Sequence, residues 1–380
     1  MHATGGGQNQ SQGHTQPPGQ AHAEVMALRD AAAKGLPTQG ATAYVTLEPC
    51  SHYGRTPPCC NALIDAGVAK VVVAVLDPNP LVSGRGVQLL RAAGIEVDVL
   101  APDSPEAVAS RELNLGFFSR MVRQTPWVRM KVAASLDGQT ALANGQSQWI
   151  TGPAARADGH AWRARACAVL TGIGTVLQDD PLLDVRHGDT PRQPHLVIVD
   201  SKLETPLTAK LFTTLGKRPV APELAAKFNL SKQAADAIAG RATYIYAAVP
   251  HAAKQAALEA LGATVIYMPE QAAAGHPGNA SKPGHAKVDL QAMVRDLAKR
   301  EINELHVEAG FKLNGSLIKA GVVDELLLYT APKLLGPGMG IANTPALAQL
   351  GDAVQLDFKS ADLVGEDLRI VARLRGRDKF

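Results

Sequence analysis

Continuous apolar segments that alternate with helical segments are the strongest constraint that this sequence places on its fold. In the first third of the chain, residues 41–47, 69–76 and 95–100 are almost entirely apolar or β-branched. Strands that are apolar on both faces are typical of parallel sheets whose two sides are covered by helices. Because helical patterns lie between these segments, the sequence predicts an α/β fold with a largely parallel sheet.

The same alternation restarts after a linker at residues 123–126, and 380 residues are enough for two domains. The expected strands of this second half are residues 127–134, 168–172, 195–200, 243–247, 265–268, 304–307 and 323–330. Residues 368–374 alternate in polarity and predict an antiparallel edge strand. We therefore expect one α/β domain over residues 21–122 and another over residues 127–380. Residues 270–285 are rich in Ala, Gly and Pro and predict a solvated loop.

Residues 1–20 consist mostly of Gly, Gln, Ser, His and Pro. Such a segment has almost nothing to bury against its ordering entropy, so we expect it to be a disordered low-complexity tail.

His22, Cys50 and Cys59 form a potential zinc site. Cys50 follows the first apolar strand, Cys59 opens a helical pattern, and His22 stands at the start of another helix. Thiolates at helix N-termini have lowered pKa values and bind metals well. Three protein ligands leave one zinc position open for water, which is typical of a catalytic site. Glu24, two residues after the histidine, is then the expected proton shuttle.

Two alternatives apply to this motif. The cysteines can be ordinary buried thiols, since free cysteine is among the most buried residue types. Cys60 is adjacent to Cys59 and would point elsewhere on a helix, so we assign it to the core. His52 is a rival ligand that we expect to line the substrate pocket instead. Eight residues separate Cys50 from Cys59, whereas the common zinc-deaminase motif has two between its cysteines.

Composition excludes several classes of function. The net charge is +3, only 4% of residues are aromatic, and no Lys/Arg block occurs, so a nucleic-acid partner is not indicated. No apolar run reaches about 18 residues, so we expect no membrane span. Four cysteines are too few for a disulfide framework and suit a reducing compartment, which makes the cytoplasm the expected location.

A second site is suggested where predicted strands end. Residues 131–138 and 147–153 are dense in side-chain donors after a strand and indicate a polar pocket. Gly172 and Gly174 follow another strand, which is a weak phosphate signal. After Glu308, a glycine-containing turn opens a helix over residues 310–316, as in sites that hold a dinucleotide pyrophosphate. An ordinary strand-to-helix turn would have the same pattern.

The stretch Glu48-Pro-Cys-Ser-His-Tyr-Gly-Arg-Thr-Pro-Pro-Cys59, together with Asp77-Pro-Asn-Pro-Leu-Val-Ser-Gly84-Arg-Gly86, resembles the bifunctional riboflavin biosynthesis deaminase/reductase family. The resemblance covers about residues 20–380. It implies a cytidine-deaminase-like three-layer domain followed by a domain similar to dihydrofolate reductase. It also implies Zn²⁺ on His22, Cys50 and Cys59, with Glu24 as acid/base for deamination of a diaminopyrimidinone ribosyl phosphate. NADPH would then reduce the ribosyl group to ribityl.

The resemblance further implies two sets of residues in the second domain. Those expected to contact NADPH are Ala133, Trp149, Thr175, Asp179, Ser201, Gly310, Phe311, Lys312, Leu313, Asn314, Gly315 and Ser316. Those expected to hold the sugar phosphate are Ser147, Arg163, Leu183, Arg186 and Glu308. Arginine suits a phosphate because its planar fork donates two hydrogen bonds at once. Arg163 and Arg186 can equally be a solvated helix charge and a loop charge.

Two further hypotheses compete with the bifunctional enzyme. Family members carry a helix and a strand pair before the His-Ala-Glu motif, and we expect this chain to lack them, with only its tail there. Without those strands the sheet has an open edge, so a reductase with an incomplete N-terminal docking module is an alternative. Otherwise another subunit completes the pocket, or the true start lies upstream of Met1. A nucleic-acid base deaminase is the third hypothesis, which the mild charge opposes. Bifunctional relatives suggest a homo-oligomer with small-molecule substrates.

Overall fold

The protein divides into two compact units in a computed structural model, one up to Arg123 and the other from Gln124 onward. The structure describes residues 2–4, 10–16, 20–53, 57–188, 190–214, 216–217, 223, 226, 240–270 and 286–380. The loop expected at residues 270–285 therefore lies outside the described residues from 271 onward. None of the described helices is long and apolar enough to cross a lipid bilayer.

The first unit is built on a sheet that, among the described residues, has five strands in the order β2-β1-β3-β4-β5. These strands are β1 (His2–Thr4), β2 (Gln10–Gln12), β3 (Thr42–Val45), β4 (Lys70–Val73) and β5 (Glu96–Val99). β3, β4 and β5 are parallel, as their continuous apolar character predicts. Ala43, Val71 and Val97 are buried on this sheet.

Two expectations about the N-terminus are corrected. Residues 1–20 do not form only a disordered tail, because β1 pairs antiparallel with both β2 and β3. The strand pair that we expected to be missing before the His-Ala-Glu motif is thus present and covers the β3 edge. The physical reason is that ladder hydrogen bonds come from the backbone, so even a polar, low-complexity segment can complete an open edge.

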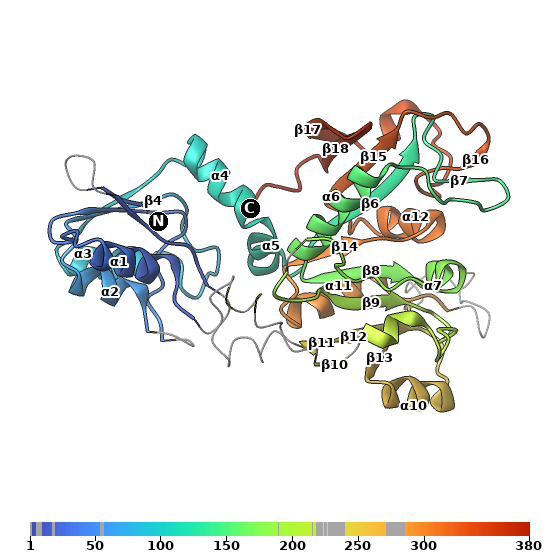
Figure 1. Ribbon diagram of the computed structural model, residues 1–380, viewed down its shortest axis with the longest axis horizontal. Coiled ribbons are helices and arrows are strands. Elements are labelled where there is room, and N and C mark those ends of the chain that lie inside the picture. The colour runs from blue at the N-terminus through green and yellow to red at the C-terminus, as the bar shows by residue number, and fades with distance from the viewer. Residues whose placement is uncertain are drawn as a thin grey trace. The chain divides into compact units, whose positions relative to one another are not determined.

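Three helices of the first unit, α1 (Ala23–Ala33), α2 (Cys59–Asp65) and α3 (Arg85–Ala92), lie side by side against the sheet (Figure 1). The buried residues Leu63 of α2 and Leu90 of α3 belong to the same cluster as the sheet valines. The segment after β5 contains α4 (Pro105–Leu113), α5 (Leu115–Phe118) and a π-helical turn at Ser119–Arg123. Ser104 caps α4, since its hydroxyl accepts a hydrogen bond from the Ala107 amide.

The second unit contains a sheet whose described strands number nine, in the order β13-β12-β9-β8-β14-β6-β15-β18-β17. The parallel strands are β6 (Trp127–Ser135), β8 (Ala168–Gly172), β9 (His195–Val199), β12 (Thr243–Ala247), β13 (Ala263–Tyr267), β14 (Glu304–Val307) and β15 (Glu325–Ala331). β18 (Asp367–Leu374) pairs antiparallel with both β15 and β17 (Leu356–Val364). β18 was expected at the sheet edge, and that placement is wrong because β17 lies outside it.

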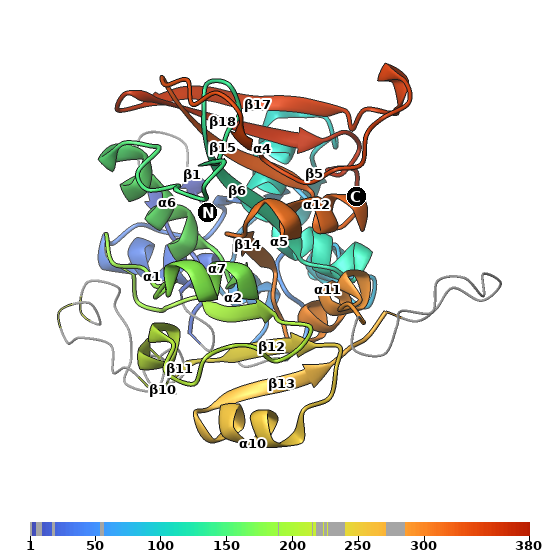
Figure 2. The same cartoon turned by 90° about the vertical axis from the view of Figure 1, so that its right-hand side faces the viewer.

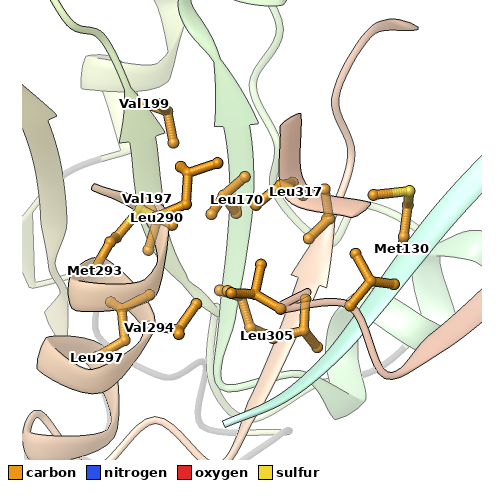
Figure 3. Packing of buried hydrophobic residues seen from close by; sticks show 14 of the residues in the cluster. Met130, Leu170, Val197, Val199, Leu290, Met293, Val294, Leu297, Leu305 and Leu317 are labelled. Carbon is orange, nitrogen blue, oxygen red and sulfur yellow. The ribbon is translucent and has the colours of Figure 1, made fainter. Parts of the chain in front are cut away.

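Helices cover both faces of this sheet. α11 (Leu290–Lys299) and α12 (Phe311–Lys319) lie on one face, where Val197, Leu170 and Leu305 meet Met293 and Leu297 (Figure 3). The other face carries α6 (Pro153–Arg165), α7 (Ile173–Asp179) and α10 (Ala252–Ala260), as Figure 2 shows from a second side. The smaller elements are β7 (Ala141–Leu142), β10 (Gly216–Lys217), β11 (Gly240–Arg241), β16 (Gly338–Met339), and 3-10 turns at Lys210–Thr214 and Leu350–Asp352.

Candidate functional site

His22, Cys50 and Cys59 converge in the first unit. His22 is the N-cap of α1, Cys59 is the first residue of α2, and Cys50 lies in the segment after β3. The Nδ1 atom of His22 lies 3.3 Å from the Cys59 Sγ and 3.6 Å from the Cys50 Sγ. A tetrahedral zinc ion, with bonds of about 2.0–2.3 Å, places its ligand atoms roughly 3.5–3.8 Å apart. The three side chains therefore fit zinc, and three ligands leave a fourth position for water.

The surroundings of Cys50 favour a thiolate. The Cys59 side chain and the His22 ring hydrogen-bond to its sulfur and hold the pKa of Cys50 well below its ordinary value. The Cys59 amide also donates to this sulfur at 3.2 Å. Cys60 is fully buried in the core, and its thiol donates to the Pro49 carbonyl oxygen at 3.2 Å. Within the described part of the chain, the possible metal ligands that cluster here are His22, Cys50 and Cys59, without His52, which is exposed.

Glu24 lies in the first turn of α1, two residues after His22, and only 8% of its surface is exposed. Burial raises the pKa of the Glu24 carboxyl, because a carboxylate loses hydration there. The side chain is also within hydrogen-bonding reach of Cys59. A carboxyl group that can hold a proton beside the open zinc position has the placement that a proton shuttle needs.

Glu48 is a residue of this site to which sequence reasoning gave no role. Its buried carboxylate accepts four backbone hydrogen bonds, from Asp77 at 3.1 Å, Gly84 at 2.9 Å, Gly86 at 2.8 Å and Val87 at 3.2 Å. A side chain at position 86 would collide with the Pro49 carbonyl oxygen, which explains the glycine. Glu48 thus ties the loop before α3 to the segment that carries Cys50. The only sequence signal was its place within the Glu-Pro-Cys motif.

We expect Glu48→Gln to lower the melting midpoint of the first unit by roughly 5–10 °C. The amide NH₂ would face two of the four backbone donors, and each buried donor left unsatisfied costs about 1–3 kcal/mol. Circular dichroism melts of the wild type and the variant measure the shift. Glu106→Gln, an exposed change in the first turn of α4, is the matched control and should shift the midpoint by less than about 2 °C. Equal midpoints for all three proteins would contradict this role.

In the second unit, Arg163 of α6 and Glu308, just after β14, form a bidentate ion pair. The guanidinium Nε donates to Oε1, and Nη2 donates to Oε2 at 2.8 Å. Each side chain is 14% exposed. Burial would raise the pKa of Glu308, but the charge and hydrogen bonds of Arg163 outweigh it and hold that pKa below its usual range. The pair is therefore an ionised, oriented unit at the end of a central strand.

Further contacts bring Leu183 and Arg186 close to this pair. Arg163 Nη1 donates to the Asp184 carbonyl oxygen at 2.8 Å, and the Arg186 guanidinium pairs with the Asp184 carboxylate at 2.5 Å. Leu183 is buried, in a backbone conformation with φ of 50°. Ser147 lies after β7 and is grouped with these residues only by the sequence resemblance.

The residues expected to contact NADPH follow the carboxyl ends of β9, β8, β14 and β6, which are consecutive neighbours in the sheet. Ser201 follows β9, Ala133 lies on β6, and Trp149 lies in the loop before α6, 68% exposed. The others lie in or next to the two helices that follow β8 and β14: Thr175 and Asp179 in α7, Gly310 as the N-cap of α12, and Phe311, Lys312, Leu313, Asn314, Gly315 and Ser316 in α12.

The two helix starts suit a diphosphate. β8 and β14 are adjacent and parallel, so α7 and α12 begin at the same edge of the sheet. A Cβ atom on Gly310 would lie 3.9 Å from the Thr175 hydroxyl, so little separates the two turns. Free amides at helix N-termini attract anions. The residues present therefore fit a dinucleotide cofactor.

Lys131 of β6 is a second residue that sequence reasoning placed in a polar pocket without a role. Burial lowers the pKa of its ammonium group, while Glu308 opposes that change. Its Nζ lies 6.0 Å from the centre of the Tyr329 ring. The signal available in the sequence was a lysine inside an otherwise apolar strand.

Comparison with protein-family models gives two matches. The model described as RibD C-terminal domain matches residues 126–370. The model described as cytidine and deoxycytidylate deaminase zinc-binding region matches residues 2–75, which includes His22, Glu24, Cys50 and Cys59.

Curated relatives and solved structures agree with these matches. The chain is 40% identical to the riboflavin biosynthesis protein RibD of Escherichia coli K12, over 94% of this chain and 88% of that protein. It is 40% identical to RibD of Haemophilus influenzae, over 94% and 86% of the two chains. A structure of Acinetobacter baumannii RibD superposes with a TM-score of 0.74 at 36% identity, over 98% of this chain and 91% of that one. A Thermotoga maritima deaminase/reductase superposes with a TM-score of 0.69 at 26% identity, over 94% and 86%.

Proposed function

Because this chain belongs to the RibD family of riboflavin biosynthesis proteins, we propose that its two units catalyse two consecutive reactions. The first unit deaminates 2,5-diamino-6-(5-phosphoribosylamino)pyrimidin-4(3H)-one, here the diaminopyrimidinone. The second unit uses NADPH to reduce the ribosyl group of the product, 5-amino-6-(5-phosphoribosylamino)uracil, to ribityl. The observation that carries the proposal is the convergence of His22, Cys50 and Cys59 next to Glu24 in a chain that also has the reductase domain.

In the first unit, His22, Cys50 and Cys59 would hold zinc, which when bound supplies a water that is easily deprotonated near neutral pH. Glu24 accepts the proton of that water and returns it to the departing ammonia. The raised pKa of Glu24 suits both halves of this exchange, because the group has to gain and then lose the proton. Glu48 keeps the loop before α3 in place beside the Cys50 segment.

In the second unit, NADPH supplies a hydride, and the chain binds and orients the sugar phosphate. Arg163 and Arg186 carry guanidinium groups at the end of β14 and on the loop after α7, where they can bind the phosphate. Glu308 is fixed by Arg163 and can accept hydrogen bonds from sugar hydroxyls. Ser147 and Leu183 complete the proposed substrate set. Ala133, Trp149, Thr175, Asp179, Ser201 and residues 310–316 are the proposed NADPH contacts.

The alternative of a reductase with a docking module depended on missing strands in the first unit. β1 and β2 pair along the β3 edge, so that reason no longer applies. We also propose that the enzyme is cytoplasmic and homo-oligomeric, with small-molecule substrates. In support of a reducing compartment, all four cysteines are free thiols.

Zinc removal tests the division of labour between the units. We expect a chelator to abolish ammonia release from the diaminopyrimidinone, since the three ligands belong to the first unit. Oxidation of NADPH with the uracil substrate should stay within about twofold of its starting rate, and added zinc should restore ammonia release. Activity is followed by ammonia detection and by NADPH absorbance. Ammonia release that persists in zinc-free protein would contradict the proposal.

A further inference from the structure

His306, in the middle of β14, is a buried polar residue that the proposed mechanism does not use. Only 1% of its surface is exposed. Neither ring nitrogen has a hydrogen-bond partner among the described residues. Burial lowers the pKa of His306 to about 3, so the ring is neutral at neutral pH. A neutral imidazole still carries one N–H donor and one acceptor nitrogen, and leaving such groups buried and unpaired is costly.

The strand places this ring within a charged layer. Successive side chains of β14 alternate, so Leu305 and Val307 face the apolar core while Glu304, His306 and Glu308 face α6. Arg129 is the neighbour of His306 on β6 and pairs with Glu304 and Glu325. The other charged groups near the ring are Lys131 on β6 and Arg163 on α6.

The hydrogen-bond acceptor that His306 can reach is Glu308. Its Nε2 atom lies 3.6 Å from the Glu308 Oε1, just beyond hydrogen-bonding distance. The same oxygen accepts the hydrogen bond from Arg163 Nε, and Arg163 also holds Oε2. In this state of the protein, Arg163 alone orients Glu308, and His306 stands ready beside it.

We propose that His306 is a positioning residue that donates to Glu308 Oε1 when the substrate phosphate draws Arg163 away. This inference rests on the proposed function, in which Arg163 and Glu308 both hold the sugar phosphate. A phosphate group carries a charge of about −1.5 to −2 at neutral pH and competes with Glu308 for the guanidinium. Closing the 3.6 Å gap then keeps Glu308 oriented and gives the buried imidazole the partner that it lacks.

Two variants test the role without changing the size of the side chain greatly. We expect His306→Met, which has no donor, to raise the KM for the uracil substrate at least about tenfold, with kcat changed less than about threefold. His306→Gln, whose amide can donate from a similar position, should return KM to within about threefold of wild type. Ammonia release, which belongs to the other unit, should stay unchanged in both. Equal KM values in wild type and His306→Met, or equal losses in both variants, would overturn the proposal.

A structure of the wild type with the uracil substrate gives a second test that needs no variant. The expected result is a distance from His306 Nε2 to Glu308 Oε1 of about 3.0 Å or less. A gap that remains at its present length with substrate bound would overturn the role of His306. Wild-type protein that oxidises no NADPH with this substrate would contradict the proposed function itself, which separates the two failures.

Discussion

Glu24→Gln should reduce ammonia release from the diaminopyrimidinone by about 10³-fold or more, while NADPH oxidation with the uracil substrate remains at the wild-type rate. The amide keeps the volume of the buried side chain but can neither accept a proton from water nor deliver one to ammonia. General acid–base groups typically contribute about 10²–10⁴-fold to a rate. Steady-state assays of the two half-reactions on the same preparation make the measurement.

The control for this prediction is Glu106→Gln, which makes the same chemical change at an exposed position of the first unit. It should retain both activities. Bound zinc should remain at the wild-type level in Glu24→Gln, because Glu24 is not a ligand. If ammonia release and NADPH oxidation fall together in Glu24→Gln, the model of two separate sites is wrong.

Arg163→Ala should lower kcat/KM for reduction of the uracil substrate by about 10²-fold or more. The change removes a phosphate ligand and leaves the partly buried Glu308 without its counter-charge, a loss that typically costs about 3–5 kcal/mol. Arg163→Lys keeps the charge but loses the planar fork, so we expect a smaller loss of about tenfold. Initial rates of NADPH oxidation at varied substrate concentration give both values.

Arg295→Ala, an exposed change on α11, is the matched control and should alter kcat/KM less than about twofold. Ammonia release should be unaffected in all three arginine variants. Wild-type kcat/KM in Arg163→Ala would show that the ion pair with Glu308 has no role in binding the sugar phosphate.

The parallel strands were the part of the fold that the sequence predicted best. β8, β12 and β14 have the predicted bounds, because strands buried on both faces are continuously apolar and their ends coincide with a change in composition. β17 was not predicted. A β-bulge between Phe358 and Ser360 interrupts its alternation, and Phe358 is 78% exposed, so neither a period of two nor burial marks this strand.

The N-terminal strands were missed for a different reason. β2 has the sequence Gln-Ser-Gln, which has the composition of a disordered segment. Its pairing depends on the open backbone of a neighbouring strand, which no local pattern contains. The tail prediction failed because tertiary pairing outweighed composition.

The site residues divide in the same way. His22, Cys50 and Cys59 were predicted as a group because ligand chemistry and helix starts are visible in the sequence. The four amides held by Glu48 and the unpartnered ring of His306 are not visible there, since they depend on which segments the fold brings together. His306 could be suspected only as a histidine among the apolar residues of a strand.

The central claim is that one chain deaminates first and reduces second at two independent sites. The most direct measurement supplies the diaminopyrimidinone and NADPH together and follows ammonia and NADPH in the same cuvette. Wild-type protein should release one ammonia for each NADPH oxidised, and Glu24→Gln should oxidise NADPH only when the uracil substrate is added. Oxidation of NADPH by Glu24→Gln with the diaminopyrimidinone alone would contradict this order of reactions.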